Sequence, residues 1–320
     1  MQKLRDIRLA YVLALLLSCA GAPAQTSQEQ KASPPQPPVK FNLMILDKQS
    51  RAIEDVRLEE LEVFEDEIKQ TVTSFARDTR PLSYGLLVDC SGSMRSQFKS
   101  VIDTAQAIIK RSDDKDETLL VRFLDSENIQ FVHEPTSDKA ALLDAIDGFY
   151  IEGGTSAIVD AVYLSATKMA EQRKGTLSER RRALVLITDG EERGSFYKTG
   201  QLMNLLRESD IQVFAIGFVN ESERKGNYAK SIPRETAVGF LTRLAEETGG
   251  RAFFPESAKD LPRVTDELMR SLHTQFIVGY TPAANPNSKP YRQLKVKLIE
   301  APGREPRTVV ARAGYTAARK

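Results

Sequence analysis

The chain has 320 residues and carries 45 Lys and Arg against 44 Asp and Glu, which gives a formal net charge of +1. Tracking a nucleic-acid backbone requires a basic excess, so this balance argues against a nucleic-acid partner. Hydrophobic residues make up 41% of the chain, which is enough for the core of one or two domains. The 2 histidines leave little room for a His-rich zinc site or a His-dependent catalytic triad.

The first 24 residues have the layout of an export signal. Basic residues precede the apolar run Leu9–Leu17, which is too short to span a bilayer comfortably. Two kinds of processing stay open: cleavage after Ala24, or cleavage at a lipobox before Cys19, which would then be lipidated and attach the chain to a membrane. In both cases we expect an exported chain, either secreted or in the periplasm or cell envelope, with no transmembrane helix in its mature form. Cys90 would be the only thiol of the folded part, which excludes an internal disulfide.

The rest of the chain divides into four stretches. Residues 25–40 are rich in Pro and Gln and predict an extended linker. Short apolar runs in residues 41–80, and again in residues 273–320, predict two regions of β-strands. Between them, residues 81–272 alternate continuous apolar runs with helically spaced ones, which predicts an open, doubly wound α/β domain with a mostly parallel sheet. We expect the two β regions to pair into a small β-sandwich, with the α/β domain inserted between them.

Within the α/β stretch, the strands are predicted at residues 84–88, 119–124, 129–132, 183–187 and 211–216. The helices are predicted at residues 98–109, 140–146, 157–170, 202–206, 240–248 and 261–272. The turn at residues 125–128 predicts a hairpin, and therefore one antiparallel edge strand. Gly249 and Gly250 predict a C-terminal cap for the helix that precedes them.

Side chains with oxygen atoms that could bind a metal follow two of these strands and precede one helix. Taken singly, Ser91, Ser93 and Thr155 could be helix caps, and Asp189 could belong to an ordinary turn. Ligands bind at the carboxyl ends of the strands in an open α/β sheet, so we expect these side chains to converge there instead. The predicted metal ligands are Asp89, Ser91, Ser93, Thr155 and Asp189. An all-oxygen set of this kind suits Mg²⁺ or Mn²⁺ better than zinc.

In residue types and in chain order, these five residues resemble the metal-ion-dependent adhesion site of von Willebrand factor A domains. The resemblance extends over residues 81–272. The segments Gly279-Tyr-Thr-Pro282 and Gly314-Tyr315 also make the wider layout similar to a bacterial von Willebrand factor A-related family first noted in acidobacteria.

The resemblance implies a role for each ligand. Ser91 and Ser93 would coordinate the metal through their hydroxyls, and Thr155 would do so directly or through water. Asp89 and Asp189 would supply charge, partly through bound waters. A cation held by few direct anionic ligands keeps a position open for another carboxylate. The resemblance therefore implies adhesion to a protein partner that offers an Asp or Glu side chain.

The sequence leaves other functions open. The metal site could be inherited without being occupied, the metal could merely stabilise an envelope scaffold, or the chain could be a metal-assisted phosphoesterase. We find no G-x-S-x-G, H-E-x-x-H, P-loop or G-x-G-x-x-G motif. The prediction is therefore a binding module that is not an enzyme. Its partner choice is expected to reside in the polar loops Gly190–Gly200 and Asn220–Glu235.

Overall fold

The computed structural model describes residues 37–172, 180–219, 233–283, 289–299 and 303–317. The predicted export signal with Cys19, most of the predicted linker and most of the predicted loop Asn220–Glu235 lie outside these residues. None of the helices in the described ranges combines the length and the apolar character that a membrane crossing requires.

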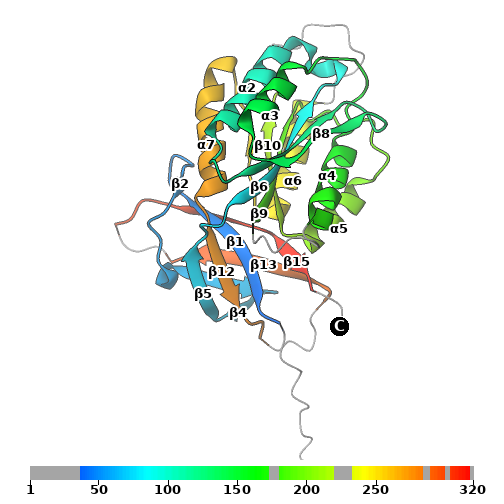
Figure 1. Cartoon of the computed structure of the whole chain (residues 1–320). Coiled ribbons are helices and arrows are strands. Elements are labelled where there is room, and N and C mark those ends of the chain that lie inside the picture. Colours follow the sequence, from blue (N-terminus) through cyan, green and yellow to red (C-terminus); the bar gives the residue numbers. More distant parts are fainter. Residues whose placement is uncertain (1–36, 173–179, 220–232, 284–288, 300–302, 318–320) are drawn as a thin grey trace, which may run out of the picture. The chain divides into compact units, whose positions relative to one another are not determined.

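A six-stranded sheet forms the centre of the α/β part (Figure 1), with the strand order β11-β10-β9-β6-β7-β8. Its strands are β6 Leu82–Asp89, β7 Glu117–Phe123, β8 Ile129–Thr136, β9 Arg181–Thr188, β10 Ile211–Gly217 and β11 Ala252–Phe253. All neighbouring pairs are parallel except β7 and β8, so the predicted hairpin and antiparallel edge strand are confirmed.

Helices cover both faces of this sheet, which is why its strands have continuous apolar runs. The helices are α2 Phe98–Arg111, α3 Lys139–Asp147, α4 Ile158–Gln172, α5 Thr199–Glu208, α6 Arg234–Thr248 and α7 Leu261–His273. On β6, Leu86 packs into the core under α2, α3 and α7, whereas Leu87 packs into the core under α4, α5 and α6. Helix α6 ends at Gly249, whose φ of 76° is left-handed, as the predicted cap requires.

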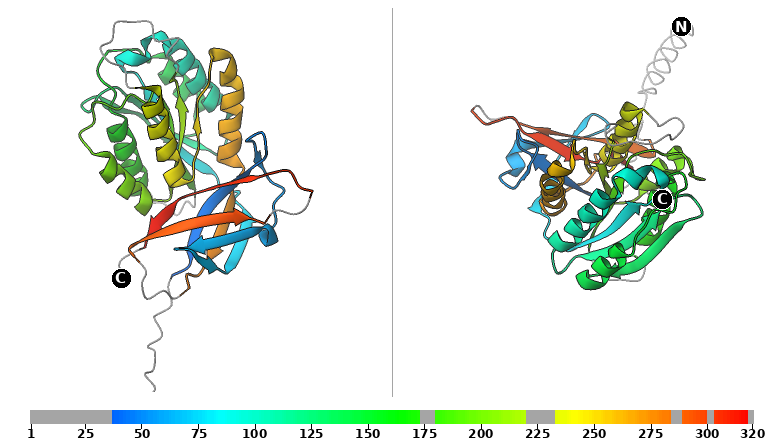
Figure 2. Two further views of the ribbon diagram at one scale, coloured as in Figure 1. Left: turned by 180° about the vertical axis from the view of Figure 1, so that it is seen from behind. Right: turned by 90° about the horizontal axis from the view of Figure 1, so that it is seen from above.

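Strands from the two ends of the chain form two further antiparallel sheets. Their strands are β1 Val39–Leu46, β2 Ala52–Ile53, β3 Leu61–Glu65, β4 Ile68–Gln70, β5 Val72–Arg77, β12 Phe276–Tyr280, β13 Tyr291–Leu298, β14 Thr308–Ala311 and β15 Gly314–Thr316. One sheet has the order β14-β1-β12-β5 with β2 beside β1, and the other has the order β15-β13-β3-β4. In Figure 2 the blue N-terminal strands lie beside the orange and red C-terminal ones.

These two sheets share one apolar core, in which Leu43 of β1, Val63 of β3 and Val278 of β12 are fully buried. The prediction of an α/β fold with a mostly parallel sheet, flanked by a small β-sandwich made from both ends of the chain, is therefore confirmed. The chain enters the α/β part between β5 and β6 and leaves it between α7 and β12. The amide N–H of Asp78 donates to the carbonyl of Gln275 at 2.8 Å and ties these two crossings together.

Short 3₁₀ turns complete the described secondary structure, namely η1 Leu58–Glu60, η2 Gly92–Ser96 and η5 Ala258–Asp260. The sequence did not predict the two-residue strands β2 and β11 or the three-residue strands β4 and β15. Segments this short show no periodicity of their own, and each exists because a longer neighbour provides the backbone hydrogen bonds.

Candidate metal site

Asp89 is the last residue of β6, and its buried carboxylate is held by three hydrogen bonds. The hydroxyls of Thr188 and Ser156 donate to Oδ2 at 2.6 and 2.8 Å, and the amide N–H of Ser91 donates to Oδ1 at 3.0 Å. Thr188 ends the neighbouring strand β9, whereas Ser156 precedes α4. Residues from three distant stretches of the chain therefore fix the position of this one carboxylate.

Ser91 and Ser93 lie directly beyond Asp89, at the start of the η2 turn. Their two Oγ atoms are 3.2 Å apart, so the turn brings both hydroxyls to the same place. Ser91 is fully buried, whereas Ser93 is partly exposed. The hydroxyl of Ser93 can therefore reach a ligand that approaches from solvent.

Thr155 lies on the loop between α3 and α4, which a pair of glycines bends toward η2. Gly153 and Gly154 have φ angles of 109° and 80°, a region that residues with a Cβ rarely adopt. The amide N–H of Gly92 in η2 donates to the carbonyl of Gly154 at 3.4 Å. Thr155 itself is exposed and stands between Gly154 and the Ser156 that holds Asp89. Its neighbours thus bring Thr155 to the same edge of the sheet.

Asp189 follows β9 and is almost fully buried, at 1% exposure. Its Oδ1 accepts a hydrogen bond of 3.0 Å from the amide N–H of Glu191. Gly190 has a φ of 77°, and a Cβ there would lie 2.9 Å from the Cβ of Ala237. The turn that carries Asp189 therefore requires glycine on grounds of both conformation and space.

The two carboxylates repel each other in a dry environment. The pKa of Asp89 is raised to about 7, mainly by burial and secondly by the nearby charge of Asp189. Within the described part of the chain, Asp89 makes no ion pair with a basic side chain. A buried carboxylate without a protein cation, next to a second carboxylate and two hydroxyls, has the donor chemistry that a hard divalent cation prefers. The residues present therefore fit Mg²⁺ or Mn²⁺.

The loop after Asp189 packs closely over the loop of Thr155. The amides of Arg193 and Gly194 both donate to the carbonyl of Ser156 at 3.0 Å. A Cβ on Gly194 would lie 2.9 Å from Oγ1 of Thr155 and 2.6 Å from its carbonyl oxygen. The side chain of Glu192 accepts the amide N–H of Val159 at 2.7 Å, which caps the first turn of α4. The two loops therefore form one packed unit beside the candidate metal site.

Sequence reasoning missed Ser156 and Thr188, the two hydroxyl residues that hold Asp89. Each stands beside a residue that was predicted, and a signal for Thr188 was present because it is a polar residue at the end of a buried apolar strand. No comparable signal marks Ser156, because its role depends on a contact with a residue 67 positions away. The roles of Asp89, Ser91, Ser93, Thr155 and Asp189 as metal ligands stay predictions.

Cys90 lies between Asp89 and Ser91, but its thiol is buried and free. Burial raises the pKa of Cys90 to about 12. The thiol is therefore protonated at neutral pH, which makes it a poor nucleophile.

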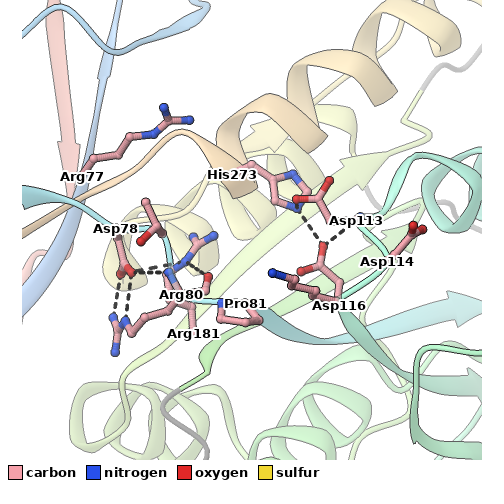
Figure 3. A pocket seen from close by; sticks show the side chains of 11 residues that line it. Arg77, Asp78, Arg80, Pro81, Asp113, Asp114, Asp116, Arg181 and His273 are labelled. Carbon is pink, nitrogen blue, oxygen red and sulfur yellow. Dashed lines mark hydrogen bonds and ion pairs between the residues drawn. The ribbon is translucent and has the colours of Figure 1, made fainter.

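A second polar cluster lies at the opposite, amino-terminal edge of the sheet, beside a cavity of about 450 Å³ (Figure 3). Asp113, Asp116 and His273 present ligand atoms within 4.8 Å of one another, which is a spacing a metal could use. However, Asp116 already accepts the amide N–H groups of Leu82 and Asp113, at 2.9 and 3.2 Å. Its carboxylate is thus occupied by the protein itself.

Both ring nitrogens of His273 face acceptors. Nδ1 is 2.9 Å from the carbonyl of Met269, and Nε2 is 2.8 Å from Oδ2 of Asp116. Two acceptors require two donated protons, so this network assigns a positive charge to the ring. Burial works to lower the pKa of His273, but the hydrogen bond and charge of Asp116, the charge of Asp113 and the bond to Met269 together outweigh it, and the pKa is raised. The cluster is therefore an ion pair that anchors the end of α7.

The chain matches the family model described as von Willebrand factor type A domain over residues 85–267, which is more than half of its length. The conserved hypothetical protein BatB from Bacteroides thetaiotaomicron is 18% identical in sequence, and the match covers 61% of this chain and 100% of that chain with a TM-score of 0.45. A von Willebrand factor type A structure from Catenulispora acidiphila is 11% identical and covers 90% of this chain and 75% of its own, with a TM-score of 0.48.

A mutant of the PilB minor pilin from Streptococcus sanguinis is 11% identical and covers 61% of this chain and 62% of its own, with a TM-score of 0.46. We base no argument on structural likenesses this distant. Among curated proteins, the comparison gives no match.

Proposed function

Because this chain belongs to the von Willebrand factor type A domain family, we propose that it is a protein-binding module of the adhesion type. Its partner would offer an Asp or Glu side chain to a divalent cation at the carboxyl edge of the parallel sheet. We further propose that it belongs to the bacterial von Willebrand factor A-related family. The β-sandwich built from both ends of the chain supports that assignment.

The observation that carries the proposal is the pair of buried carboxylates, Asp89 and Asp189, beside the hydroxyls of Ser91 and Ser93. These four residues, with Thr155, would hold Mg²⁺ or Mn²⁺. The bound ion would supply a positively charged, open coordination position suited to a carboxylate oxygen. The protein contributes the rigidity, because Thr188 and Ser156 fix Asp89 before any ion arrives.

We propose binding rather than catalysis as the activity of this edge. The Cys90 thiol beside it is buried with a raised pKa, and the hydroxyl of Ser93 bonds to that of Ser91. We also propose that the chain acts outside the cytoplasm, which is supported by the signal-like pattern of its first 24 residues. Lipidation at Cys19 would add attachment to a membrane.

The test is a pull-down from cell-envelope extract of the source organism, performed in Mg²⁺ and again in EDTA. The immobilised full chain is compared with Asp189→Asn and with a matched control, Asp103→Asn. Asp103 lies on α2 and makes an exposed ion pair with Lys99, so the control removes the same charge away from the site. We expect wild type and Asp103→Asn to retain a partner protein in Mg²⁺ and to release it in EDTA. Asp189→Asn should not retain that protein in either buffer.

Two results would contradict the proposal. In the first, EDTA lowers the stability of the chain but leaves retention of the partner protein unchanged, which would indicate a scaffold whose metal is only structural. Robust turnover of generic phosphoesters that is lost in Asp189→Asn would indicate a metal-assisted phosphoesterase instead.

A further inference from the structure

Two exposed aromatic side chains stand on the two loops of the candidate metal site. Among the described residues, the large hydrophobic side chains that face solvent are Ile68, Tyr150, Phe196 and Ile299. Phe196 is 75% exposed and Tyr150 is 58% exposed, and these are the highest values of the four. Phe196 lies on the loop that follows Asp189, and Tyr150 lies on the loop that carries Thr155. Single exposed hydrophobic residues are common on protein surfaces, so their placement needs support from how they are held.

Phe196 is held rigidly although its ring is exposed. The amides of Phe196 and Tyr197 donate to the carboxylate of Asp160 at 2.7 and 2.8 Å. Asp160 is 1% exposed and lies in the first turn of α4, where the helix dipole favours a negative charge. Tyr197 stacks on Tyr163 with ring centroids 3.9 Å apart, and Phe196 packs edge-on against Tyr197 at 5.5 Å. The ring of Phe196 is therefore presented to solvent on a fixed base.

Tyr150 is held by a buried cation. The guanidinium of Arg122 lies 4.8 Å from the centre of the Tyr150 ring and donates to the Tyr150 carbonyl at 3.0 Å. Arg122 is 4% exposed and also pairs with Glu152 at 3.1 Å. One face of the Tyr150 ring is thus covered by the protein. Its neighbour Ile151 packs against the core under α2, α3 and α7, whereas Tyr197 beside Phe196 packs against the core under α4, α5 and α6, so the two exposed rings rest on opposite faces of the sheet.

The distance from Phe196 to the candidate site is short. Gly194 lies directly against Thr155, since a Cβ on Gly194 would be 2.9 Å from Oγ1 of Thr155. Phe196 is two residues further along, so its α-carbon lies within roughly 7 Å of that of Gly194. An extended partner segment advances about 3.3 Å per residue, so one bound near Thr155 reaches Phe196 within a few residues.

We propose that the exposed ring of Phe196, here called the aromatic rim, binds a bulky apolar side chain of the partner, close in sequence to the Asp or Glu that the metal site takes. The inference rests on the proposed function and specifies the partner: a polypeptide segment that pairs an acidic residue with a large apolar one. Rigid, exposed aromatic residues lose little side-chain entropy on binding, which is why such residues often dominate the free energy of an interface.

The experiment uses a phage-displayed library of random peptides, selected on the immobilised full chain in saturating Mg²⁺ and eluted with EDTA. Enriched peptides are synthesised, and their affinities are measured for wild type, Phe196→Ala and the matched control Ile68→Ala on β4. We expect enriched peptides to combine an acidic with a bulky apolar residue. Phe196→Ala should weaken their binding about tenfold or more, and Ile68→Ala should leave it unchanged.

Mg²⁺ binding, measured by calorimetry without peptide, separates the rim from the metal site. It should be the same in Phe196→Ala as in wild type, as should the unfolding temperature. Peptides that need Mg²⁺ and an acidic residue, but have no apolar preference and bind Phe196→Ala equally well, would overturn the rim and leave the proposed function intact. A selection that yields no Mg²⁺-dependent peptide would contradict the proposed function, and the rim with it.

Discussion

The two edges of the parallel sheet bury the same kind of group in opposite electrostatic settings. At the amino edge, Asp78 and Asp116 lie among the basic side chains of Arg80, Arg181 and His273 (Figure 3). Burial works to raise the pKa of Asp78 and of Asp116, but hydrogen bonds from these partners and their neighbours outweigh it, and both pKa values are lowered. These carboxylates are charged and compensated by the protein.

At the carboxyl edge, burial and the charge of Asp189 raise the pKa of Asp89 to about 7. The hydroxyls that surround Asp89 donate hydrogen bonds, but they carry no positive charge. The comparison shows that this chain can surround a buried carboxylate with basic side chains. It does so at the amino edge, where the chain enters and leaves the α/β part. Among the described residues, Asp89 has no basic partner of this kind, and the proposed function assigns the compensating charge to a divalent cation.

The largest effect should come from removing the buried base of the amino edge. Arg181→Met leaves Asp78 with one fewer compensating charge and leaves the carbonyl of Leu272 without the donor that now lies 2.5 Å away. Because breaking a buried ion pair costs several kcal/mol, we expect the free energy of unfolding to fall by about 3 kcal/mol, measured by chemical denaturation.

The matched control for this variant is Arg111→Met, which breaks an exposed ion pair with Asp266. Surface pairs contribute little, so the control should change the free energy of unfolding by less than about 1 kcal/mol. If the two variants lost the same stability, the amino edge would not be the clamp that the comparison requires.

The second prediction compares the effect of an Asp→Asn substitution on stability at the two edges of the sheet. In EDTA, Asp116→Asn should lower the free energy of unfolding by about 2 kcal/mol, because two backbone donors and His273 lose a charged acceptor. Asp89→Asn also weakens three donated hydrogen bonds, but it removes the repulsion with Asp189, so it should cost less stability than Asp116→Asn in the same buffer.

Adding Mg²⁺ should make Asp89→Asn the less stable of the two variants, because it removes a proposed metal ligand. A wild-type chain with Mg²⁺ at about 100 times its dissociation constant gains roughly 2.7 kcal/mol, measured as a shift in the denaturation midpoint. Asp116→Asn should gain the same amount, whereas Asp89→Asn should gain almost nothing. Equal gains in all three chains would show that Mg²⁺ binds somewhere other than this edge.

The fold could be predicted from the sequence because the strands of the α/β part are buried on both faces. Residues 84–88 and 183–187 are continuous apolar runs, and a polar residue that directly follows such a run has to lie at the carboxyl edge of the sheet. Asp89 and Asp189 could be placed together for that reason alone.

The amino-edge clamp could not be predicted in this way. Asp78, Arg181 and His273 lie in three separate stretches of the chain, and no motif links them. The support of Phe196 by Asp160 was hidden for a similar reason. That contact joins residues 36 positions apart, and an acidic residue in the first turn of a helix is common without any such partner.

The third prediction concerns one hydroxyl of the candidate site. Ser93 makes its side-chain hydrogen bond to Ser91, and removing a partly exposed hydroxyl should cost the metal-free protein less than about 1 kcal/mol. If Ser93 is a metal ligand, Ser93→Ala should weaken Mg²⁺ binding about tenfold, measured by calorimetry. Ser100→Ala on α2 is the matched control and should leave the affinity unchanged. An unchanged affinity in Ser93→Ala would remove Ser93 from the ligand set.

The smallest effect is the pH dependence of the clamp at the end of α7. The pKa of His273 is raised above its ordinary value of 6.5, so its ion pair stabilises the fold fully below that pH and fades as pH rises through the raised pKa. The pKa of Asp116 is lowered from 3.8, so its contribution is present above that pH and is lost as pH falls through the lowered pKa. The pair therefore contributes most between about pH 4 and about pH 6.5.

We expect His273→Gln to be less stable than wild type by about 1 kcal/mol at about pH 6, with the difference shrinking toward about pH 9. Free energies of unfolding measured across this range give the curve, and Asp116→Asn should reduce the same pH dependence because it removes the nearer of the two carboxylates that face the ring. A constant difference between His273→Gln and wild type would mean that the ring acts through packing and not through its charge. In that case the amino edge would still be compensated by its arginines, and the contrast with Asp89 would rest on Arg80 and Arg181 alone.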